Sequence, residues 1–519
     1  MTVGIIPTMK KLSFISRIAL LLGFLFTLDK LLAFVRVIII ARAFNLSFEL
    51  DAFNAADILP TLLTALISGE ALAVAFIPVL IQTLTLRGRE AAWDLFSRVV
   101  NLAFILTGAL AVIAAIFADP IVRLWMPGFT ADQQHIISLL MRLDLIASCI
   151  FSISGLVVGG LQANEHFLLP ALAPILYNIG QIFGAAILAP ATPLHFGPLT
   201  LPALGLGVYG LAYGVILGAA LHLLIQIPGL IRYGFRWTPS VRINDPAMIA
   251  SLKVIGPRIV TVLGIQLMFV VRSYLASRLG QTGAITSLSY GWMIMQVPET
   301  LLGTAIATAL LPTLSELAAR ADWDGFRQTI EKAIRALIAL SLPAGAIIAA
   351  GIHPLLRAAF HFDEAGTNLL TATTRVYMLT LCGYALQEVA ARTFYARKEA
   401  TIPLVTVLIR LAVYLIIGIS GLIFFKSIGA PVIAAAELSL TVEAIVMLII
   451  LNRRMKEPVR IDGVLLKGLA AALLGGGAAY ALAVMLPGSA VVTAILGMTV
   501  GTIIALVIVQ KEVRLLLNL

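Results

Sequence analysis

The sequence predicts an all-α integral membrane protein with about fourteen transmembrane helices. Of its 519 residues, 60% are hydrophobic and 12% are charged, whereas soluble domains carry roughly 25% charged residues. Apolar stretches of about 20 residues, long enough to cross a ~30 Å hydrocarbon layer as a helix, recur along the chain. Short alternating segments typical of a membrane β-barrel do not occur in the sequence, so we expect helices to satisfy the backbone.

The expected spans follow the apolar stretches in order. They are 14–42, 53–81, 97–118, 136–162, 169–190, 207–231, 254–278, 284–311, 333–352, 368–393, 402–425, 429–451, 464–486 and 488–509. If the N-terminus is cytoplasmic, 23 of the 36 Lys and Arg residues fall in cytoplasmic segments and four in outer loops. This asymmetry places both termini in the cytoplasm. It also accounts for the net charge of +10 without a nucleic-acid partner.

The chain contains an internal repeat. The matching segments are 34–36 with 270–272, 77–80 with 311–314, and 161–164 with 394–397, at offsets of 236, 234 and 233 residues. Six spans separate the copies, so both copies have the same orientation and form a parallel repeat. A substrate site is expected between the halves of such a repeat.

The repeat predicts four regions. They are an N-terminal lobe at 1–232, a basic cytoplasmic linker at 233–253, a C-terminal lobe at 254–455, and two additional helices within 456–519.

Charged residues inside the spans are the candidate functional residues. A charge at the bilayer centre costs at least ~2.5 kcal/mol, so such residues usually face a watery cavity or a partner. Guanidinium groups offer the planar fork of donors that binds phosphate. The candidates for substrate binding are Arg36, Arg272, Lys30 and Arg258. The candidates for charge pairing or coupling are Asp29, Asp57, Glu70 and Glu299.

Helical spacing relates the cations to their neighbours. At about 100° per residue, Asp29 and Arg36 lie about 20° apart, and Arg258 and Arg272 about 40° apart, so each pair shares a helix face. Lys30 lies about 120° from Arg36, so either the first helix bends or Lys30 makes a different contact. Two readings stay open for these charges: a functional cavity, or internal ion pairs that only hold helices together.

No enzyme site is expected from the sequence. Nucleotide-binding loops and metal-binding spacings of His, Cys or carboxylate residues do not occur. We therefore expect no catalytic residue, no metal and no cofactor. His222, inside a span, is interpreted as a packed or capping residue rather than a ligand.

The N-terminal block resembles the MurJ (MviN) family of lipid II flippases, within the multidrug, oligosaccharidyl-lipid and polysaccharide exporter superfamily. The matching residues are Phe34-Val35-Arg36, Ala41-Arg42-Ala43-Phe44, Asp51-Ala52-Phe53, Leu59-Pro60-Thr61-Leu62-Leu63 and Ala75-Phe76-Ile77-Pro78-Val79-Leu80. In the second half, Pro298, Leu311-Pro312-Thr313-Leu314-Ser315 and Leu342-Pro343 are similar to the eighth and ninth helices of the family.

The resemblance implies two six-helix lobes around a cationic cavity, and a groove for a polyprenyl tail formed by the last two helices. It also ties residues at the positions of Arg36 and Lys30 to function. The glutamate-glycine of the family becomes Gly69-Glu70. The chain also departs from the family at Thr64, where a basic residue is common, and at Tyr290-Gly291-Trp292-Met293 and Gln296, where charges of the family are missing. Arg272 on the neighbouring helix is a candidate substitute for one of them.

The expected function is therefore the translocation of an undecaprenyl-pyrophosphate-linked peptidoglycan precursor, lipid II, across the bacterial cytoplasmic membrane by alternating access. The expected partners are this lipid-linked oligosaccharide, membrane lipids and, as candidates, cell-wall synthesis proteins. Three alternatives stay open: a flippase for another polysaccharide-lipid intermediate, an ion-coupled multidrug-type exporter, and a degenerate scaffold homologue. An acidic cavity dominated by Asp57 and Glu70 would favour the exporter.

The repeat makes Arg36 and Arg272 equivalent residues of the two halves. We expect both guanidinium groups to line one central cavity, exposed to water, with Asp29 moderating their repulsion.

The charge distribution also predicts the topology. Reporter fusions after Arg98, Arg242 and Arg460 should be cytoplasmic, and fusions near Gly128 and His195 should be external. An external reporter at Arg242 would contradict the six-plus-six arrangement, because the basic cluster that joins the two repeats lies there.

Overall fold

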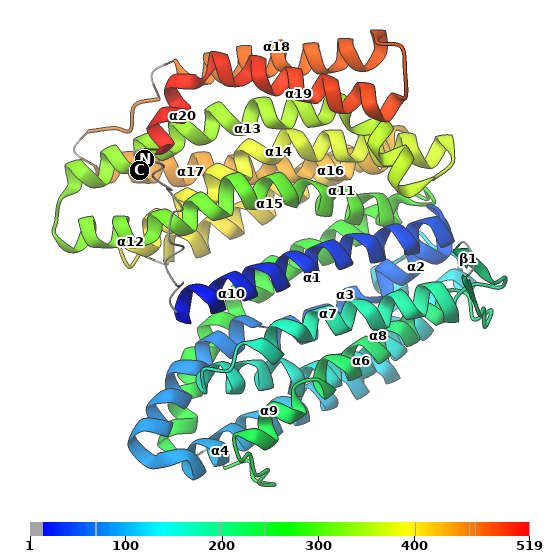
Figure 1. The fold of residues 1–519 in the computed structure, drawn as a ribbon, viewed down its shortest axis with the longest axis vertical. Coiled ribbons are helices and arrows are strands. Elements are labelled where there is room, and N and C mark those ends of the chain that lie inside the picture. The colour runs from blue at the N-terminus through cyan, green and yellow to red at the C-terminus, as the bar shows by residue number, and fades with distance from the viewer. Residues whose placement is uncertain are drawn as a thin grey trace, which may run out of the picture. The chain divides into compact units, whose positions relative to one another are not determined.

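The chain is almost entirely helical (Figure 1). The computed structural model describes residues 14–67, 70–196, 199–242, 244–399, 401–455, 457–461 and 463–517. It divides into two compact units. The first contains residues 1–43, 59–118 and 139–260, and the second contains 44–58, 119–138 and 261–519.

The first unit contains the following elements. They are α1 (Phe14–Phe44), α3 (Ile58–Ile67), α4 (Glu70–Ile116), most of α6 (Ala131–Ala163), α7 (Leu168–Phe183), the π-helix η1 (Gly184–Leu188), α8 (Val208–Leu224), α9 (Ile227–Arg232) and the start of α10 (Pro246–Ser277). A hairpin of β1 (Leu194–Phe196) and β2 (Leu199–Leu201) interrupts the otherwise all-helical chain, with Leu194 paired to Leu201.

The second unit contains the remaining elements. They are α2 (Phe48–Ala56), α5 (Ala118–Trp125), the rest of α10, α11 (Ala284–Glu299), the π-helix η2 (Thr300–Thr304), α12 (Ala305–Ala319), α13 (Trp323–Phe360), α14 (Glu364–Ala396), α15 (Thr401–Phe424), η3 (Lys426–Ile428), α16 (Ala430–Ala435), η4 (Ala436–Leu438), α17 (Ser439–Arg454), α18 (Val464–Met485), α19 (Ala490–Ile508) and α20 (Gln510–Leu517).

Eleven helical segments within the described residues are long and apolar enough to cross a membrane. They are Phe48–Ile67, Phe76–Ile116, Ala131–Ala163, Leu168–Leu188, Val208–Arg232, Ala284–Ala319, Trp323–Phe360, Thr401–Phe424, Ala430–Arg454, Val464–Met485 and Ala490–Ile508. Three predicted spans, on α1, α10 and α14, are outside this group. Helices α1 and α14 contain several charged residues, and α10 contributes only a shorter apolar helix, Val262–Ser277. The prediction of a multispanning helical membrane protein is therefore confirmed.

The predicted cytoplasmic segment between the second and third spans is helical. Residues 82–96 are helical, and α4 changes direction at Gly88, whose φ of 84° is one that glycine adopts at little cost. The segment after this turn is amphipathic and packs the Trp93 indole against the Phe96 ring (centroids 5.4 Å apart). It also holds the linker, because Trp93 Nε1 donates to the Tyr233 carbonyl (3.0 Å) and Arg98 Nη1 to Asp245 (2.9 Å).

Helices α7 and α8 pack through glycine. A Cβ on Gly180 would lie 2.4 Å from the Cα of Gly218, and a Cβ on Gly184 would lie 2.6 Å from the Cα of Gly214. Close backbone approach of this kind is the usual basis of helix association in lipid, where apolar side chains gain little from leaving the hydrocarbon. Glycine spacing therefore fixes this helix pair.

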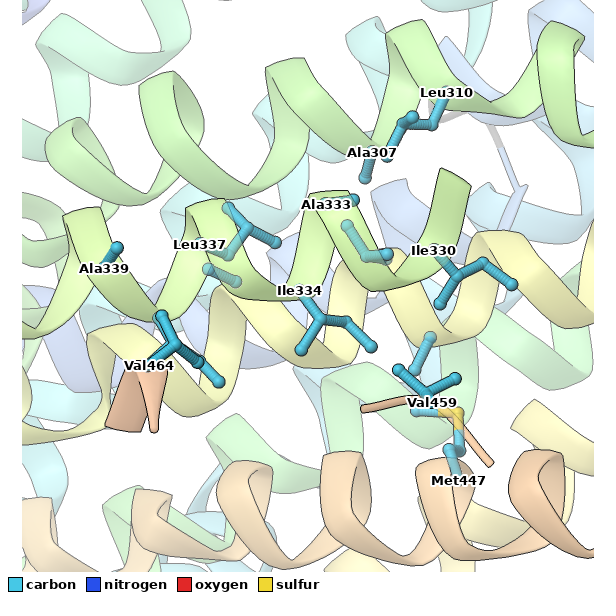
Figure 2. Packing of buried hydrophobic residues seen from close by; sticks show 14 of the residues in the cluster. Ala307, Leu310, Ile330, Ala333, Ile334, Leu337, Ala339, Met447, Val459 and Val464 are labelled. Atoms are coloured by element: carbon cyan, nitrogen blue, oxygen red, sulfur yellow. The ribbon is translucent and has the colours of Figure 1, made fainter. Parts of the chain in front are cut away.

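The core of the second unit gathers along α13 (Figure 2). Ile330, Ile334 and Leu337 are buried on one face of α13 beside Ala307 and Leu310 of α12, and Met447 of α17 belongs to the same cluster. The spacing of three and four residues along α13 places these side chains on one helix face.

Helices α18 and α19 join this unit through small residues. A Cβ on Gly501 would lie 2.3 Å from the carbonyl oxygen of Gly475, and a Cβ on Gly497 would lie 2.5 Å from that of Ala479. Gly476 approaches Ala346 of α13 in the same way. The two helices outside the internal repeat are thus packed closely on α13.

One polar contact recurs in the two halves of the chain. Arg142 Nε on α6 donates to the carbonyl of Ala115 on α4 (3.0 Å), and Arg375 Nε on α14 donates to the carbonyl of Ala349 on α13 (2.8 Å). The arginines are 233 residues apart and the alanines 234, which match the offsets of the sequence repeat.

A buried carboxylate anchors the C-terminal helix α20. The Glu512 side chain is 1% exposed, accepts a hydrogen bond from Lys467 Nζ (2.9 Å), and lies 4.0 Å from Arg335 Nη2. Although burial opposes ionisation, the hydrogen bond from Lys467 and the charges of Lys467 and Arg335 hold the pKa of the Glu512 carboxyl below its usual value. Its stabilising effect is present above the pKa of the unfolded chain and is lost as the pH falls through the lowered pKa.

Glu512→Gln should therefore loosen α20 at neutral pH. The substitution removes a charge-assisted acceptor worth roughly 1–3 kcal/mol, so amide hydrogen exchange in α20 should be about tenfold faster or more at pH 7. The variant and the parent should converge once the pH has fallen below the lowered pKa of Glu512, where the carboxyl binds a proton. Glu457→Gln is the control, because Glu457 is 57% exposed in its pair with Arg327 and such pairs contribute little. Unchanged exchange in Glu512→Gln at pH 7 would contradict the anchoring role.

Candidate functional site

The candidate residues of α1 are tied to α7. Asn178 Nδ2 on α7 donates to Asp29 Oδ1 (2.8 Å), and Lys30 Nζ lies 3.5 Å from Asp29 Oδ2. Asp29 is buried, whereas the Lys30 side chain is 84% exposed. Lys30 thus pairs with its sequence neighbour Asp29, and its ammonium group is exposed.

Arg36 lies two turns further along α1 and is half-buried. Its Nε is buried and has no hydrogen-bond partner among the described residues. The partners recorded for Asp29 are Lys30 and Asn178, so the shared helix face does not bring Asp29 and Arg36 into an ion pair here. Arg36 therefore retains donor capacity for another acceptor.

Arg272 on α10 is buried in the second unit. It is 7% exposed, its guanidinium carbon lies 4.9 Å from the centre of the Phe269 ring, and its buried Nη1 has no hydrogen-bond partner among the described residues. The expected exposure of Arg272 to water is thus not met, since neighbouring aromatic side chains cover it. Arg36 and Arg272 belong to different units, and their proximity stays a prediction.

Three charged residues of the second unit form a buried ion cluster that the sequence analysis did not identify. Arg410 Nη2 on α15 lies 3.1 Å from Glu437 Oε2 on η4, and Arg410 Nη1 lies 3.8 Å from Glu443 Oε2 on α17. Thr406 Oγ1 donates to Glu443 Oε1 (3.3 Å). Arg410 lies in the predicted span 402–425, and Glu437 and Glu443 lie in the next span, 429–451. Opposite charges in two consecutive spans were the sequence feature that could have predicted this cluster.

Asp51 is a second residue that the sequence analysis did not select. It is 1% exposed and accepts hydrogen bonds from Gly283 N (2.6 Å), Thr286 N (2.8 Å) and Thr286 Oγ1 (2.8 Å) at the start of α11. Gly283 has no side chain that could cap α11, so its first N–H groups need an acceptor from elsewhere. Asp51, 232 residues earlier, supplies a carboxylate where the helix dipole favours negative charge.

Glu299 ends α11 next to the π-helix η2. It is 2% exposed, and Thr304 Oγ1 donates to its Oε1 (3.0 Å). A Cβ on Gly303 would lie 2.6 Å from the same oxygen. The π-turn and the small residue together leave room for this carboxylate inside the unit.

For the other three candidates, Asp57, Glu70 and Arg258, the structure gives the position in the helix. Asp57 is the C-cap of α2, with its backbone N–H bonded to the Phe53 carbonyl (3.2 Å). Glu70 is the first residue of α4 and Arg258 lies within α10. The side chains of Glu70 and Arg258 lie outside the described residues.

His222 is a packed residue, as expected. Its Nδ1 lies 2.5 Å from Ser154 Oγ, and Gln226 Nε2 donates to Ser154 Oγ (2.8 Å), so α8 is tied to α6. Among the residues that the structure describes, no group of three or more His, Cys, Asp or Glu could hold a metal ion.

Curated relatives with similar sequences carry one description. The chain is 29% identical over 413 residues to a lipid II flippase MurJ of Burkholderia cenocepacia. The aligned region covers 78% of this chain and 77% of the relative. It is 26% identical over 388 residues to a probable lipid II flippase MurJ of Vibrio cholerae, covering 72% and 71% of the two chains.

Solved structures show the same fold. A lipid II flippase MurJ in an inward closed conformation has a TM-score of 0.77 at 19% identity, covering 95% of this chain and 99% of that chain. A multidrug resistance MATE family transporter of the MOP superfamily, in an inward-facing conformation, has a TM-score of 0.66 at 16% identity, covering 82% and 94%. The family model described as lipid II flippase MurJ matches residues 40–505. Because this match spans most of the chain, the protein belongs to the MurJ family.

Proposed function

We propose that this protein translocates lipid II across the bacterial cytoplasmic membrane by alternating access. The observation that carries the proposal is the family match over residues 40–505. The likeness to a solved MurJ structure over 95% of the chain supports the same fold. Transport of this kind changes the side of the membrane on which the cargo lies and requires no catalytic residue.

The transmembrane arrangement of this proposal has fourteen crossings, two six-helix lobes in a parallel repeat, and both termini in the cytoplasm. Each of the fourteen predicted spans overlaps a helix or a run of consecutive helices. The recurring arginine–carbonyl contact of Arg142 and Arg375 supports the repeat. The glycines before α8 and α16 do so as well, since Gly207 and Gly429 share positive φ values of 56° and 81° with ψ near −140°.

The cations of α1 are proposed to bind the pyrophosphate of the cargo. Arg36 has a buried Nε without a partner among the described residues, and Lys30 extends an exposed ammonium group beyond Asp29. Arginine keeps its charge at every physiological pH and can bind phosphate through two parallel hydrogen bonds. In the second half, Arg272 and Arg258 are proposed as additional phosphate-binding residues.

The polyprenyl tail is proposed to bind along α19. An apolar cavity of about 200 Å³ lies between α13, η2 and α19. Leu340, Pro343 and Ile347 of α13 and Met498 and Leu506 of α19 line it. Its lining carries almost no polar atoms, so a hydrocarbon chain fits it and a sugar does not.

The energy for directional transport is proposed to come from an ion gradient, the membrane potential or consumption of the cargo. The potential supplies ~2.3 kcal/mol per elementary charge per 100 mV. Asp29, Asp57, Glu70 and Glu299 are the proposed coupling residues.

Rescue of a bacterium depleted of its own lipid II flippase tests the function directly. Expression of this chain should restore growth, and it should return lipid II to the outer leaflet, measured by the accessibility of its headgroup to an external reagent. Growth arrest with normally inserted protein, and lipid II retained on the inner leaflet, would overturn the proposal.

Arg36→Glu should abolish that rescue. At an effective dielectric constant of about 20, two like charges 4 Å apart repel by about 4 kcal/mol, which lowers phosphate affinity by more than a hundredfold. Arg36→Lys should keep partial activity, because a point charge remains without the forked donors.

Arg42→Glu is the matched control for Arg36→Glu. It reverses the same charge on the same helix at an exposed position near its end. Membrane insertion of all variants should equal that of the parent. Full transport by Arg36→Glu would exclude contact between Arg36 and the anionic cargo.

A further inference from the structure

The second unit has a groove that the proposed transport route does not use. It has a volume of about 390 Å³ and lies between α13, α14 and α18. Its lining residues are Ala346, Ala349 and Ala350 of α13, Arg375, Val376 and Leu379 of α14, and Tyr480 of α18. The groove is apolar apart from one arginine and one tyrosine.

The arginine is held at the groove by the backbone. Arg375 Nε donates to the Ala349 carbonyl (2.8 Å), and the side chain is exposed. No carboxylate lies within ion-pair distance of Arg375 in the described part of the chain. Both Nη groups of Arg375 thus remain available as donors, and the hydrogen bond from Nε to the Ala349 carbonyl fixes their orientation.

The depth of this arginine follows from the helices. Arg375 is eleven residues after the start of α14 at Glu364, and Ala349 is eleven residues before the end of α13 at Phe360. At ~1.5 Å per residue, both lie about 16 Å from the tip of this helix pair. A helix of 33 residues is about 50 Å long and exceeds a ~30 Å hydrocarbon layer by about 10 Å at each end. With α14 centred on the layer, Arg375 would lie inside it, about 6 Å from its boundary.

A guanidinium inside the layer is stabilised by backbone carbonyls, by an anion or by reaching the headgroup level. The Ala349 carbonyl bonds only the Nε of Arg375, so an anionic headgroup can still bind its Nη groups. The side chains that line the groove beside Arg375 are uncharged, so none of them is an anion. Two of them are exposed, Leu379 by 67% and Tyr480 by 57%. Exposed apolar groups on spanning helices contact acyl chains, and tyrosine is common near the headgroup level. The surroundings of Arg375 thus combine an acyl-chain surface with a donor for one anionic group.

The surroundings of Arg142, the equivalent arginine of the first unit, differ from those of Arg375. Arg142 makes the same backbone contact but is only half-exposed and has further contacts. The difference comes from α18, which lies outside the internal repeat and packs on α13 through Gly475 and Gly476. This packing supplies Tyr480 as the third wall beside Arg375.

We propose that the groove between α13, α14 and α18 binds an anionic glycerophospholipid of the bilayer. Arg375 binds the lipid phosphate through its Nη groups, the Tyr480 hydroxyl donates to the same headgroup, and the acyl chains lie over Leu379 and Val376. Arginine-lined pockets between membrane helices recognise lipid phosphates in this manner. The site is separate from the cation positions proposed for the cargo, so it stands whether or not the cargo is lipid II.

The test uses the purified full-length protein in detergent. Phosphatidylglycerol and phosphatidylcholine with identical acyl chains are titrated separately, and binding is followed by native mass spectrometry and by the shift in melting temperature. The parent should bind phosphatidylglycerol at least tenfold more tightly than phosphatidylcholine. Arg375→Gln should reduce the affinity for phosphatidylglycerol at least tenfold and bring it to the level of phosphatidylcholine.

Two arginine variants are matched controls. Arg357→Gln removes the same charge from an exposed position on α13 that does not line the groove, and Arg142→Gln removes the equivalent arginine of the first unit. Both should bind phosphatidylglycerol within twofold of the parent.

If Arg375→Gln does not fold, a variant that keeps the Arg375 charge tests whether the groove binds the lipid. Ala350→Trp fills the groove without changing Arg375 and should also weaken phosphatidylglycerol binding at least tenfold. The proposal is overturned if the folded Arg375→Gln protein, or Ala350→Trp, binds within twofold of the parent. It is equally overturned if the parent does not distinguish the two lipids, since the groove would then not select an anionic headgroup.

Discussion

The whole structure depends on satisfying backbone polar groups within the hydrocarbon layer. An N–H or C=O group exposed to lipid costs several kcal/mol, so the chain crosses the membrane as helices. The groups that helices leave unsatisfied are then met by specific side chains. Asp51 caps the first N–H groups of α11. Arg142 and Arg375 make a different kind of contact, in which a side chain donates to a carbonyl of the neighbouring helix, and the Ala349 carbonyl lies inside α13 rather than at its end. These polar contacts connect segments far apart in the sequence because no water competes for them.

Helix packing follows from the same environment. In lipid, burial of apolar side chains gives little net attraction, so close backbone contact must provide it. Gly180 and Gly218 bring α7 and α8 together, and Gly475 and Gly501 do the same for α18 and α19. Gly476 of α18 and Met498 of α19 approach α13, so both helices outside the internal repeat pack on α13. Those helices create both the apolar cavity along α19 and the groove beside Arg375.

Buried charges divide into two groups by their partners. Arg410 is neutralised by Glu437 and Glu443 within the second unit, which is the structural use of a charge in a membrane protein. The Nε atoms of Arg36 and Arg410 are both buried without a hydrogen-bond partner in the described part of the chain, so the difference lies in the ion pairs. Arg36 and Arg272 make no carboxylate ion pair among the described residues, whereas Arg410 makes two. An incompletely satisfied cation is stable only where an anion or water reaches it at some stage. This distinction supports the choice of Arg36 as a phosphate-binding residue over the more fully paired arginines.

The sequence by itself determined the membrane-spanning helical fold, the recurring segments and the family, because these depend on apolar length, residue spacing and local identity. It also placed His222 correctly as a packed residue. The partner of each charge was decided only by the tertiary structure. Helical spacing put Asp29 and Arg36 on one face, yet Asp29 bonds Asn178 of another helix, and Asp51 caps a helix 232 residues away. Spacing along one helix gives a direction, whereas a hydrogen bond requires atoms within about 3 Å, and helix packing alone sets that distance.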